Sequence, residues 1–185
     1  MSRLTVFPDN APDNVELDTE DGAVIAERMK EIGVTFERWT PKGILPKDAD
    51  DKAVMEAYAE DIERIKKIGG YNTVDVVRLA PDNPKKKEAR GKFLSEHIHA
   101  EDEVRFFVEG EGIFYLRTGG KLYMTLCSRG DLISVPAGVK HWFDMGPEPD
   151  FTCIRFFQTP EGWVAEFTGD DIAEKFPKFE KHLAA

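Results

Sequence analysis

Hydrophobic residues recur with a helical period in the first part of the chain and with a strand period in the rest. In residues 21–32 and 51–68 the apolar positions are three or four apart, which is typical of amphipathic helices. Glycines follow both segments, as is common where helices end. Residues 82–90 are strongly polar and are expected to present a solvated helical face. Shorter apolar runs predict strands at residues 4–7, 34–39 and 73–79.

From residue 91 onward, short β-rich runs follow one another between turns that contain glycine or proline. Many short strands at regular spacing indicate an antiparallel barrel or sandwich. The tail after residue 171 is expected to form a short helix that Pro177 breaks. The predicted strands cover residues 97–99, 103–109, 113–117, 121–127, 132–135, 142–145 and 151–157, with one more at 163–167.

These elements predict an α+β, mainly β, fold organised as a single domain over residues 1–185. Its front section, about residues 1–90, is expected to pack on a β core formed by about residues 91–168, with residues 169–185 as a C-terminal tail. The length of 185 residues suits one domain with a substantial core. The sequence contains no internal repeat and no low-complexity segment.

Composition and charge indicate which classes of partner and which compartment suit the chain. A net charge of -10 argues against nucleic acids and anionic membranes as partners, because both require a basic surface. No apolar run approaches the about 18 residues of a membrane span, and the N-terminal residues do not resemble a signal peptide. Cys127 and Cys153 lie in predicted strands and are expected to be buried free thiols, as in a reducing compartment. We therefore expect a cytoplasmic protein.

Three of the four histidines indicate a metal site. Residues two apart on a strand share a face, so His97 and His99 present two imidazoles to one side. Glu103 follows after a short bend, and His141 can join them if its strand crosses the same interior. Three imidazoles and one carboxylate suit Fe(II), Ni(II), Mn(II), Co(II) or Zn(II), and suit calcium or magnesium poorly. An octahedral ion held this way keeps two positions open for substrate, which indicates catalysis. His182 has no such neighbours and is expected to be exposed.

The spacing of these residues resembles that of the cupin superfamily, which implies a double-stranded β-helix, or jelly-roll, barrel with flanking helices. The second cupin motif ends in an asparagine, and Met145 stands in its place. That asparagine is usually structural, so its loss leaves the metal prediction unchanged. The first motif is matched by Gly91, His97, His99, Glu103 and Gly110, and the second by Gly130, Pro136, Gly138 and His141.

A narrower resemblance is carried by residues 36–39, 99–110, 131–138, 141–146 and 161–173. On these residues nearly the whole chain resembles, within that superfamily, the acireductone dioxygenase family of the bacterial type. The resemblance implies a reaction of methionine salvage, in which O2 cleaves 1,2-dihydroxy-3-oxo-5-methylthiopentene, the acireductone. The Fe(II) form is expected to give formate and 4-methylthio-2-oxobutanoate, and the Ni(II) form 3-methylthiopropionate, formate and carbon monoxide. The resemblance further implies a monomer with one metal ion per chain, bound by His97, His99, Glu103 and His141.

Other side chains near the motifs are candidates for substrate contact. Arg105 lies two residues beyond Glu103, so it can share the inner face and offer a planar fork of donors to an enolate oxygen. A surface position or a structural ion pair is the alternative. Arg155 lies in an apolar run and needs a partner if buried, either the substrate, a ligand carboxylate or a structural carboxylate. The candidate pocket walls for the methylthio tail, with core packing as the alternative, are Phe93, Phe143 and Trp163.

Three acidic residues, Glu96, Glu101 and Asp102, flank the predicted ligands. Exposure to solvent is the expected role of each. The alternative is that one of them orients a ligand imidazole through its second ring nitrogen.

Two other functions fit the same motifs. One is a different metal-dependent cupin enzyme, such as another dioxygenase, an isomerase or a decarboxylase. The other is a non-catalytic cupin that binds a small ligand or a protein, although such proteins often lose part of the ligand set. Product analysis separates them, because only an acireductone dioxygenase consumes an enediol ketone with O2 and releases formate.

Overall fold

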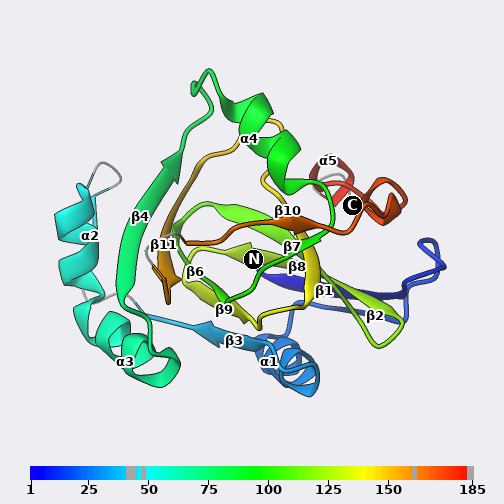
Figure 1. Ribbon diagram of the computed structural model, residues 1–185, viewed down its shortest axis with the longest axis horizontal. Coiled ribbons are helices and arrows are strands. Elements are labelled where there is room, and N and C mark those ends of the chain that lie inside the picture. The colour runs from blue at the N-terminus through cyan, green and yellow to red at the C-terminus, as the bar shows by residue number, and fades with distance from the viewer. Residues whose placement is uncertain (41–44, 47–48, 160–161, 183–185) are drawn as a thin grey trace.

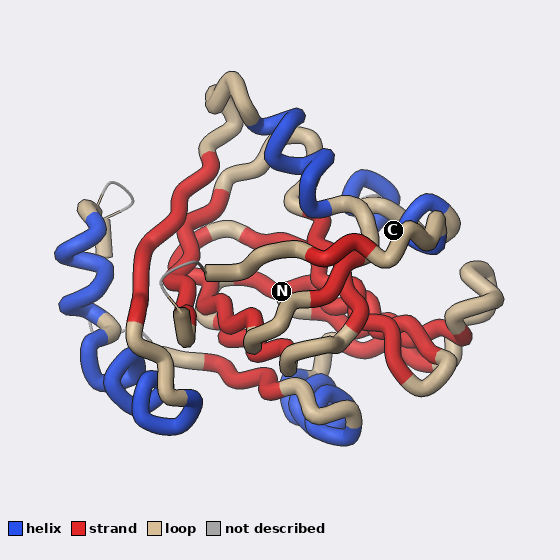
Figure 2. The backbone as a smooth tube through the Cα atoms, in the orientation of Figure 1, coloured by secondary structure: helices blue, strands red, loops and turns tan. Residues whose placement is uncertain are grey.

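Two antiparallel β-sheets form the centre of the molecule in the computed structural model, which describes residues 1–40, 45–46, 49–159 and 162–182 (Figures 1 and 2). The seven-stranded sheet has the order β12 (Glu166–Phe167), β5 (His97–Ile98), β10 (Lys140–Asp144), β7 (Glu111–Thr118), β8 (Lys121–Ser128), β1 (Arg3–Pro8) and β2 (Leu17–Thr19). The five-stranded sheet has the order β3 (Thr35–Arg38), β9 (Asp131–Val135), β6 (Glu103–Glu109), β11 (Phe151–Phe157) and β4 (Thr73–Leu79). The predicted α+β, mainly β, class is confirmed. The ladders of these strands remain two sheets and do not close into one barrel.

Alternation along the strands divides the side chains into an inner and an outer set. In β6, Phe107 belongs to the apolar cluster between the sheets, whereas Val104 and Phe106 belong to a second cluster beneath the helices. Glu103 and Arg105 share the parity of Phe107 and therefore point inward. The same inner cluster takes residues from both sheets, among them Leu4, Phe114, Phe143, Ile133, Phe151 and Cys153.

The second amphipathic segment forms two helices, α2 (Asp51–Ala57) and α3 (Ala59–Gly69), so the prediction of one continuous helix is wrong. The break is at Tyr58, whose backbone leaves helical geometry at φ −115° and ψ 17°. Its buried ring makes an edge contact with Phe106, at 4.7 Å between centroids. Val54 of α2, Tyr58 and Ile62 of α3 all belong to the same cluster on the five-stranded sheet. The apolar face that the helical period predicts is therefore kept on both sides of the break.

The remaining helices agree more closely with the pattern. Helix α1 (Gly22–Glu31) begins at Asp21, whose carboxylate accepts a 2.8 Å hydrogen bond from the Ala23 N–H. Helix α4 (Lys86–Phe93) lies in and just beyond the polar stretch predicted to be helical, and none of its residues is fully buried. It lies beside β10, at the upper rim of the sheets in Figure 1.

The predicted strand at residues 163–167 is reduced to the two residues of β12. Its neighbour β5 offers only His97 and Ile98 for pairing, so a longer ladder has no partner. Trp163 and Val164 form loop structure and use their polar groups elsewhere in the molecule.

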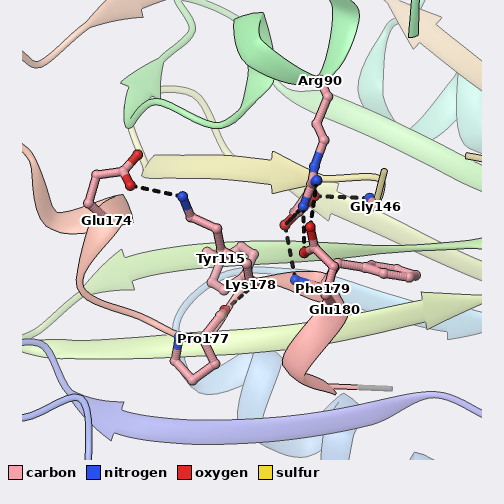
Figure 3. A network of polar contacts seen from close by, with 9 residues as sticks. Arg90, Tyr115, Gly146, Glu174, Pro177, Lys178, Phe179 and Glu180 are labelled. Atoms are coloured by element: carbon pink, nitrogen blue, oxygen red, sulfur yellow. Dashed lines mark hydrogen bonds and ion pairs between the residues drawn. The ribbon is translucent and has the colours of Figure 1, made fainter. Parts of the chain in front are cut away.

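The tail forms a 3-10 turn, η1 (Ile172–Glu174), and a short helix, α5 (Phe179–His182), on either side of Pro177, as predicted. Arg90 of α4 fixes this tail (Figure 3). Its guanidinium bonds the buried Asp144 at 2.8 and 3.0 Å and Glu180 at 2.8 and 2.7 Å. The second oxygen of Asp144 also accepts the Phe179 N–H at 3.0 Å. We call Arg90, Asp144 and Glu180 the tail clasp.

Three smaller expectations concern single residues and the whole chain. Cys127 and Cys153 are buried and free, as predicted, and burial raises the pKa of the Cys153 thiol to about 12. The side chain of His182 lies outside the described residues, so its predicted exposure stays a prediction. Among the described residues, no helix has the length and apolar character that a membrane crossing requires.

Candidate metal centre

The four predicted ligands come from both sheets and meet at one end of the inner space. His97 of β5 and His141 of β10 are directly opposite each other in the ladder. His99 follows β5, and Glu103 begins β6. All four residues are buried, and one ligand atom from each lies within 4.8 Å of the others. The structure therefore brings together the residues that spacing alone had grouped.

A hydrogen bond from the turn before β10 links the second motif to the first. Gly138 has a positive φ of 78°, which favours glycine, and lies just before β10. Its N–H donates a 3.0 Å hydrogen bond to the carbonyl of His99. The stretch that carries His141 is thereby fixed to the stretch that carries His99.

Backbone carbonyls determine which ring nitrogen of each histidine faces the centre. The Nδ1 atoms of His97 and His141 donate to the carbonyls of Ser95 and Val139, both at 2.7 Å. The Nδ1 atom of His99 donates to the Val164 carbonyl at 2.9 Å. A neutral imidazole that donates from Nδ1 presents a lone pair at Nε2, which is the atom a metal binds.

The donor atoms converge on one point. Nε2 of His99 and Nε2 of His141 lie 3.1 and 3.2 Å from the same oxygen, Oε2 of Glu103. Lone pairs facing a carboxylate at this distance require a cation or a proton between them. The arrangement therefore fits a metal ion with nitrogen and oxygen ligands.

Local electrostatics keep Glu103 ionised. Burial, the largest influence, acts to raise its pKa, but Arg105 and the hydrogen bonds from His141 and His99 outweigh it and hold the pKa well below the usual range. The histidines respond differently. Burial, reinforced by His141, lowers the pKa of His97 to about 4. Burial also opposes protonation of His99, but its hydrogen bonds to Glu103 and Val164 raise the pKa overall. A metal ion must displace any proton that His99 carries.

Arg105 occupies an aromatic enclosure next to Glu103. Its Nη2 donates to Oε1 of Glu103 at 3.0 Å, so the two carboxylate oxygens serve the guanidinium and the imidazoles separately. Only 4% of Arg105 is exposed. Its guanidinium carbon lies 4.5 Å from the ring centre of Phe143 and 5.5 Å from that of Trp163. Within the part of the chain that the structure describes, the Nε–H of Arg105 has no acceptor. A buried, unused donor beside a metal-ligand set indicates a site for an anionic oxygen.

Comparison with known proteins agrees with this geometry. The model of the ARD/ARD' family matches residues 3–165. The chain belongs to this family. An acireductone dioxygenase from Parvibaculum lavamentivorans is 59% identical over 180 residues, which cover 97% of this chain and 98% of that protein. Another from Hahella chejuensis is 53% identical over 181 residues, covering 98% and 97%.

A solved structure gives the same result for the fold. Acireductone dioxygenase from Bacillus anthracis, with a cadmium ion in its active centre, superposes with a TM-score of 0.78 at 28% identity. The match covers 90% of this chain and 98% of that one. The predicted cupin fold is thereby confirmed.

In this member of the acireductone dioxygenase family, Arg155 lies on β11 directly opposite Arg105 of β6. Its Nε and Nη2 atoms donate to Asp75 of β4 at 2.9 and 2.6 Å. The Arg155 side chain is 28% exposed, and its guanidinium carbon lies 5.7 Å from the ring centre of Trp163. Arg155 thus neighbours the aromatic enclosure but pairs with a structural carboxylate, and its role toward substrate stays a prediction.

The three predicted pocket aromatics lie at different depths around Arg105. Phe143 and Trp163 contact the guanidinium directly, whereas Phe93 reaches it through Phe143, at 6.5 Å between ring centres. Trp163 also stacks on the imidazole of His99 at 6.3 Å and 29°. Their predicted contact with a methylthio tail is not tested by these positions.

Sequence reasoning missed one residue near the centre of this family member, Phe167, and misjudged the exposure of another, Glu96. Phe167 makes an edge contact with His97 at 5.9 Å, and strand parity with Trp163 was a signal that could have found it. Glu96, expected to be exposed, is 1% exposed, and that expectation is wrong. Glu101 and Asp102 are half-buried and accept backbone N–H groups, from Gln158 at 2.7 Å and from Ala137 at 3.0 Å.

Proposed function

We propose that this chain is an acireductone dioxygenase of methionine salvage, with His97, His99, Glu103 and His141 as its metal ligands. It cleaves 1,2-dihydroxy-3-oxo-5-methylthiopentene with O2, and uses one Fe(II) or Ni(II) ion per chain. The iron form gives formate and 4-methylthio-2-oxobutanoate, and the nickel form gives 3-methylthiopropionate, formate and carbon monoxide. The observation that carries the proposal is the convergence of four buried ligand atoms beside an arginine with an unused donor.

The donor set fits the proposed metals. Three imidazoles and one carboxylate form a mixed nitrogen and oxygen set, and the Nδ1 hydrogen bonds leave each Nε2 as the ring nitrogen that faces the centre. When bound, the ion supplies a Lewis acid that favours the ionised enediol and orients it. The chain supplies the neutral imidazoles, the ionised Glu103 and the surroundings.

Arg105 is proposed to bind an anionic oxygen of the substrate through its Nε–H. An enediol next to a ketone is acidic, so the substrate carries negative charge when ionised. The hydrogen bond from Nη2 to Glu103 holds the guanidinium in place before substrate arrives. Phe143 and Trp163 cover it and exclude water, which strengthens a charged hydrogen bond at this depth.

Arg155 and the outer aromatics have supporting roles in this proposal. Arg155, oriented by Asp75, provides a second positive charge next to Trp163. Phe93 and Phe143 provide an apolar surface for the methylthio tail. We further infer that the enzyme acts as a monomer in the cytoplasm.

Product analysis tests the function. The apoprotein is reconstituted separately with Fe(II) and Ni(II) and mixed with acireductone and O2. Formate with the keto acid from the iron form, and carbon monoxide from the nickel form, are the expected results. The matched control is His97→Ala, which should retain no metal and turn over at the uncatalysed rate. If metal binds at one per chain but neither form exceeds that rate, the substrate assignment is wrong and another cupin activity applies.

A further inference from the structure

The segment 162–168 lies across the metal centre and contacts it at three points. Trp163 stacks on His99 and approaches Arg105. The Val164 carbonyl accepts the Nδ1–H of His99 at 2.9 Å. Phe167 packs its ring edge against His97 at 5.9 Å. This segment, which we call the strap, therefore influences the orientation of two predicted ligands.

Few contacts of its own backbone hold the strap. Its pairing with the sheet is the two-residue strand β12, opposite β5. At one end, the Trp163 indole N–H donates to the carbonyl of Asp102 at 3.1 Å. At the other end, Thr168 contacts Glu96 through both its N–H and its hydroxyl. Its N–H donates to the Glu96 carbonyl at 3.1 Å, and its hydroxyl donates to the Glu96 carboxylate at 2.7 Å.

Glu96 is placed to hold Thr168 of the strap and not to bind a metal. It precedes His97 by one residue, so its side chain points away from the inner face that His97 occupies. Its carboxylate is fully buried and receives Arg117 Nη1 at 3.3 Å in addition to the Thr168 hydroxyl. Arg117 also binds Asp9 at 3.0 Å and Asp170 at 2.9 Å. The Arg117 guanidinium thus offsets the negative charge of the buried Glu96 carboxylate. The other hydrogen bond to this carboxylate comes from Thr168 of the strap.

We propose that Glu96 is a positioning residue that fixes the strap on the metal centre and so sets the orientation of His99 through the Val164 carbonyl. The ligand part of this inference rests on the proposed function, whereas the anchoring of the strap does not. Groups that orient a metal-binding imidazole through its second nitrogen commonly change metal affinity or activity by about 10–100-fold when they are lost.

Four single variants separate anchoring from general stability. Glu96→Gln keeps the shape of the carboxylate but removes its charge. Thr168→Val removes only the hydroxyl, at an exposed position where folding is not at risk, and Thr168→Ser restores the hydroxyl. Asp9→Asn is the matched control, because it alters another acceptor of Arg117 and leaves Thr168 untouched.

Two readouts are made on each protein. The first is amide hydrogen exchange of residues 163–168 in the metal-free protein. The second is Ni(II) affinity by competition with a chelator, read together with the thermal midpoint. Thr168→Val and Glu96→Gln should exchange faster in the strap and bind Ni(II) about 10-fold or more weakly. Thr168→Ser and Asp9→Asn should match the wild type in both readouts.

The outcomes distinguish this inference from the proposed function. Strap exchange and Ni(II) affinity at wild-type values in both Thr168→Val and Glu96→Gln overturn the positioning role. So does a loss of affinity that Asp9→Asn reproduces with the same fall in thermal midpoint. If the wild type itself binds no Ni(II), the proposed function fails, while the exchange comparison still decides whether Glu96 anchors the strap.

Discussion

Arg90 and Arg105 both bind a buried carboxylate, but they differ in how many of their N–H donors have an acceptor. Arg90 uses Nε and both terminal nitrogens, in four hydrogen bonds to Asp144 and Glu180. Arg105 bonds Glu103 through Nη2, and its buried Nε–H has no acceptor in the described part of the chain. Arg90 forms the tail clasp on the outer side, and Arg105 lies between the sheets at the metal centre.

The difference separates structural from functional positions. A guanidinium whose three nitrogens all donate hydrogen bonds contributes stability, because removing it leaves a buried carboxylate without its charge partner. A guanidinium with a buried N–H that has no acceptor already carries a free-energy cost. An oxygen of a bound ligand can offset that cost by accepting the hydrogen bond. Substitutions in the clasp should therefore lower stability at constant turnover, and substitutions at the centre should lower turnover. Arg155 falls between them, since Asp75 occupies two of its nitrogens at a partly exposed position.

The largest effect is expected for Arg105→Ala. The four metal ligands remain, so metal content should stay at one per chain, while kcat/KM falls by about 100–1000-fold through loss of a preorganised donor. Steady-state kinetics of the Ni(II) form, with metal analysis of the same sample, measures both quantities. Arg105→Lys is the control, because it keeps the charge and loses the planar fork. A kcat/KM equal to that of the wild type would make Arg105 a structural residue and remove the distinction from Arg90.

The ligand set was predictable because its signals are local. His97 and His99 are two apart on one strand, Glu103 begins the next strand, and His141 lies in a second motif of recognisable spacing. The two-sheet fold was predictable for the same reason, since glycine-rich turns separate short apolar runs. Neither prediction required knowledge of contacts between distant residues.

The burial of Glu96 and the contact of Val164 with His99 were missed because they depend on contacts between distant residues. Thr168 reaches Glu96 across 72 positions of sequence, and the Val164 carbonyl reaches His99 across 65. No spacing rule connects such pairs, so Glu96 was expected at the surface. The break at Tyr58 had no glycine or proline to mark it, and Tyr58 belongs to the cluster in which residues of α2 and α3 pack on the five-stranded sheet.

Arg90→Ala should give the largest effect on stability, with turnover unchanged. Asp144 is fully buried and, among the described residues, keeps only the N–H groups of Gly146 and Phe179 once the guanidinium is lost. Loss of one partner of a buried pair costs about 3–5 kcal/mol, so urea unfolding should show a correspondingly lower free energy of unfolding. Turnover per folded, metal-loaded molecule should equal that of the wild type. A large fall in kcat at full metal loading would mean that the clasp also acts on the centre.

The smallest effect is a pH dependence carried by Glu180. Its hydrogen bond to Arg90 lowers its pKa to about 2 in the folded chain, whereas a glutamate in an unfolded chain titrates near about 4.3. The stabilisation is therefore complete above about pH 4.3 and disappears as the pH falls toward 2. Solvent screening at this half-exposed carboxylate keeps the contribution small.

Comparison of the wild type with Glu180→Gln isolates this contribution, because all other acidic groups titrate in both proteins. The difference in free energy of unfolding, measured by urea at several pH values from 6 down to the acid limit of folding, should shrink as the pH falls. In an Arg90→Ala background the same substitution should give a difference that depends on pH much less, because the largest of the influences that lower the pKa of Glu180 is gone. A pH dependence that persists there at full size would assign the shift to the backbone hydrogen bond and Lys178 of the tail, and not to Arg90.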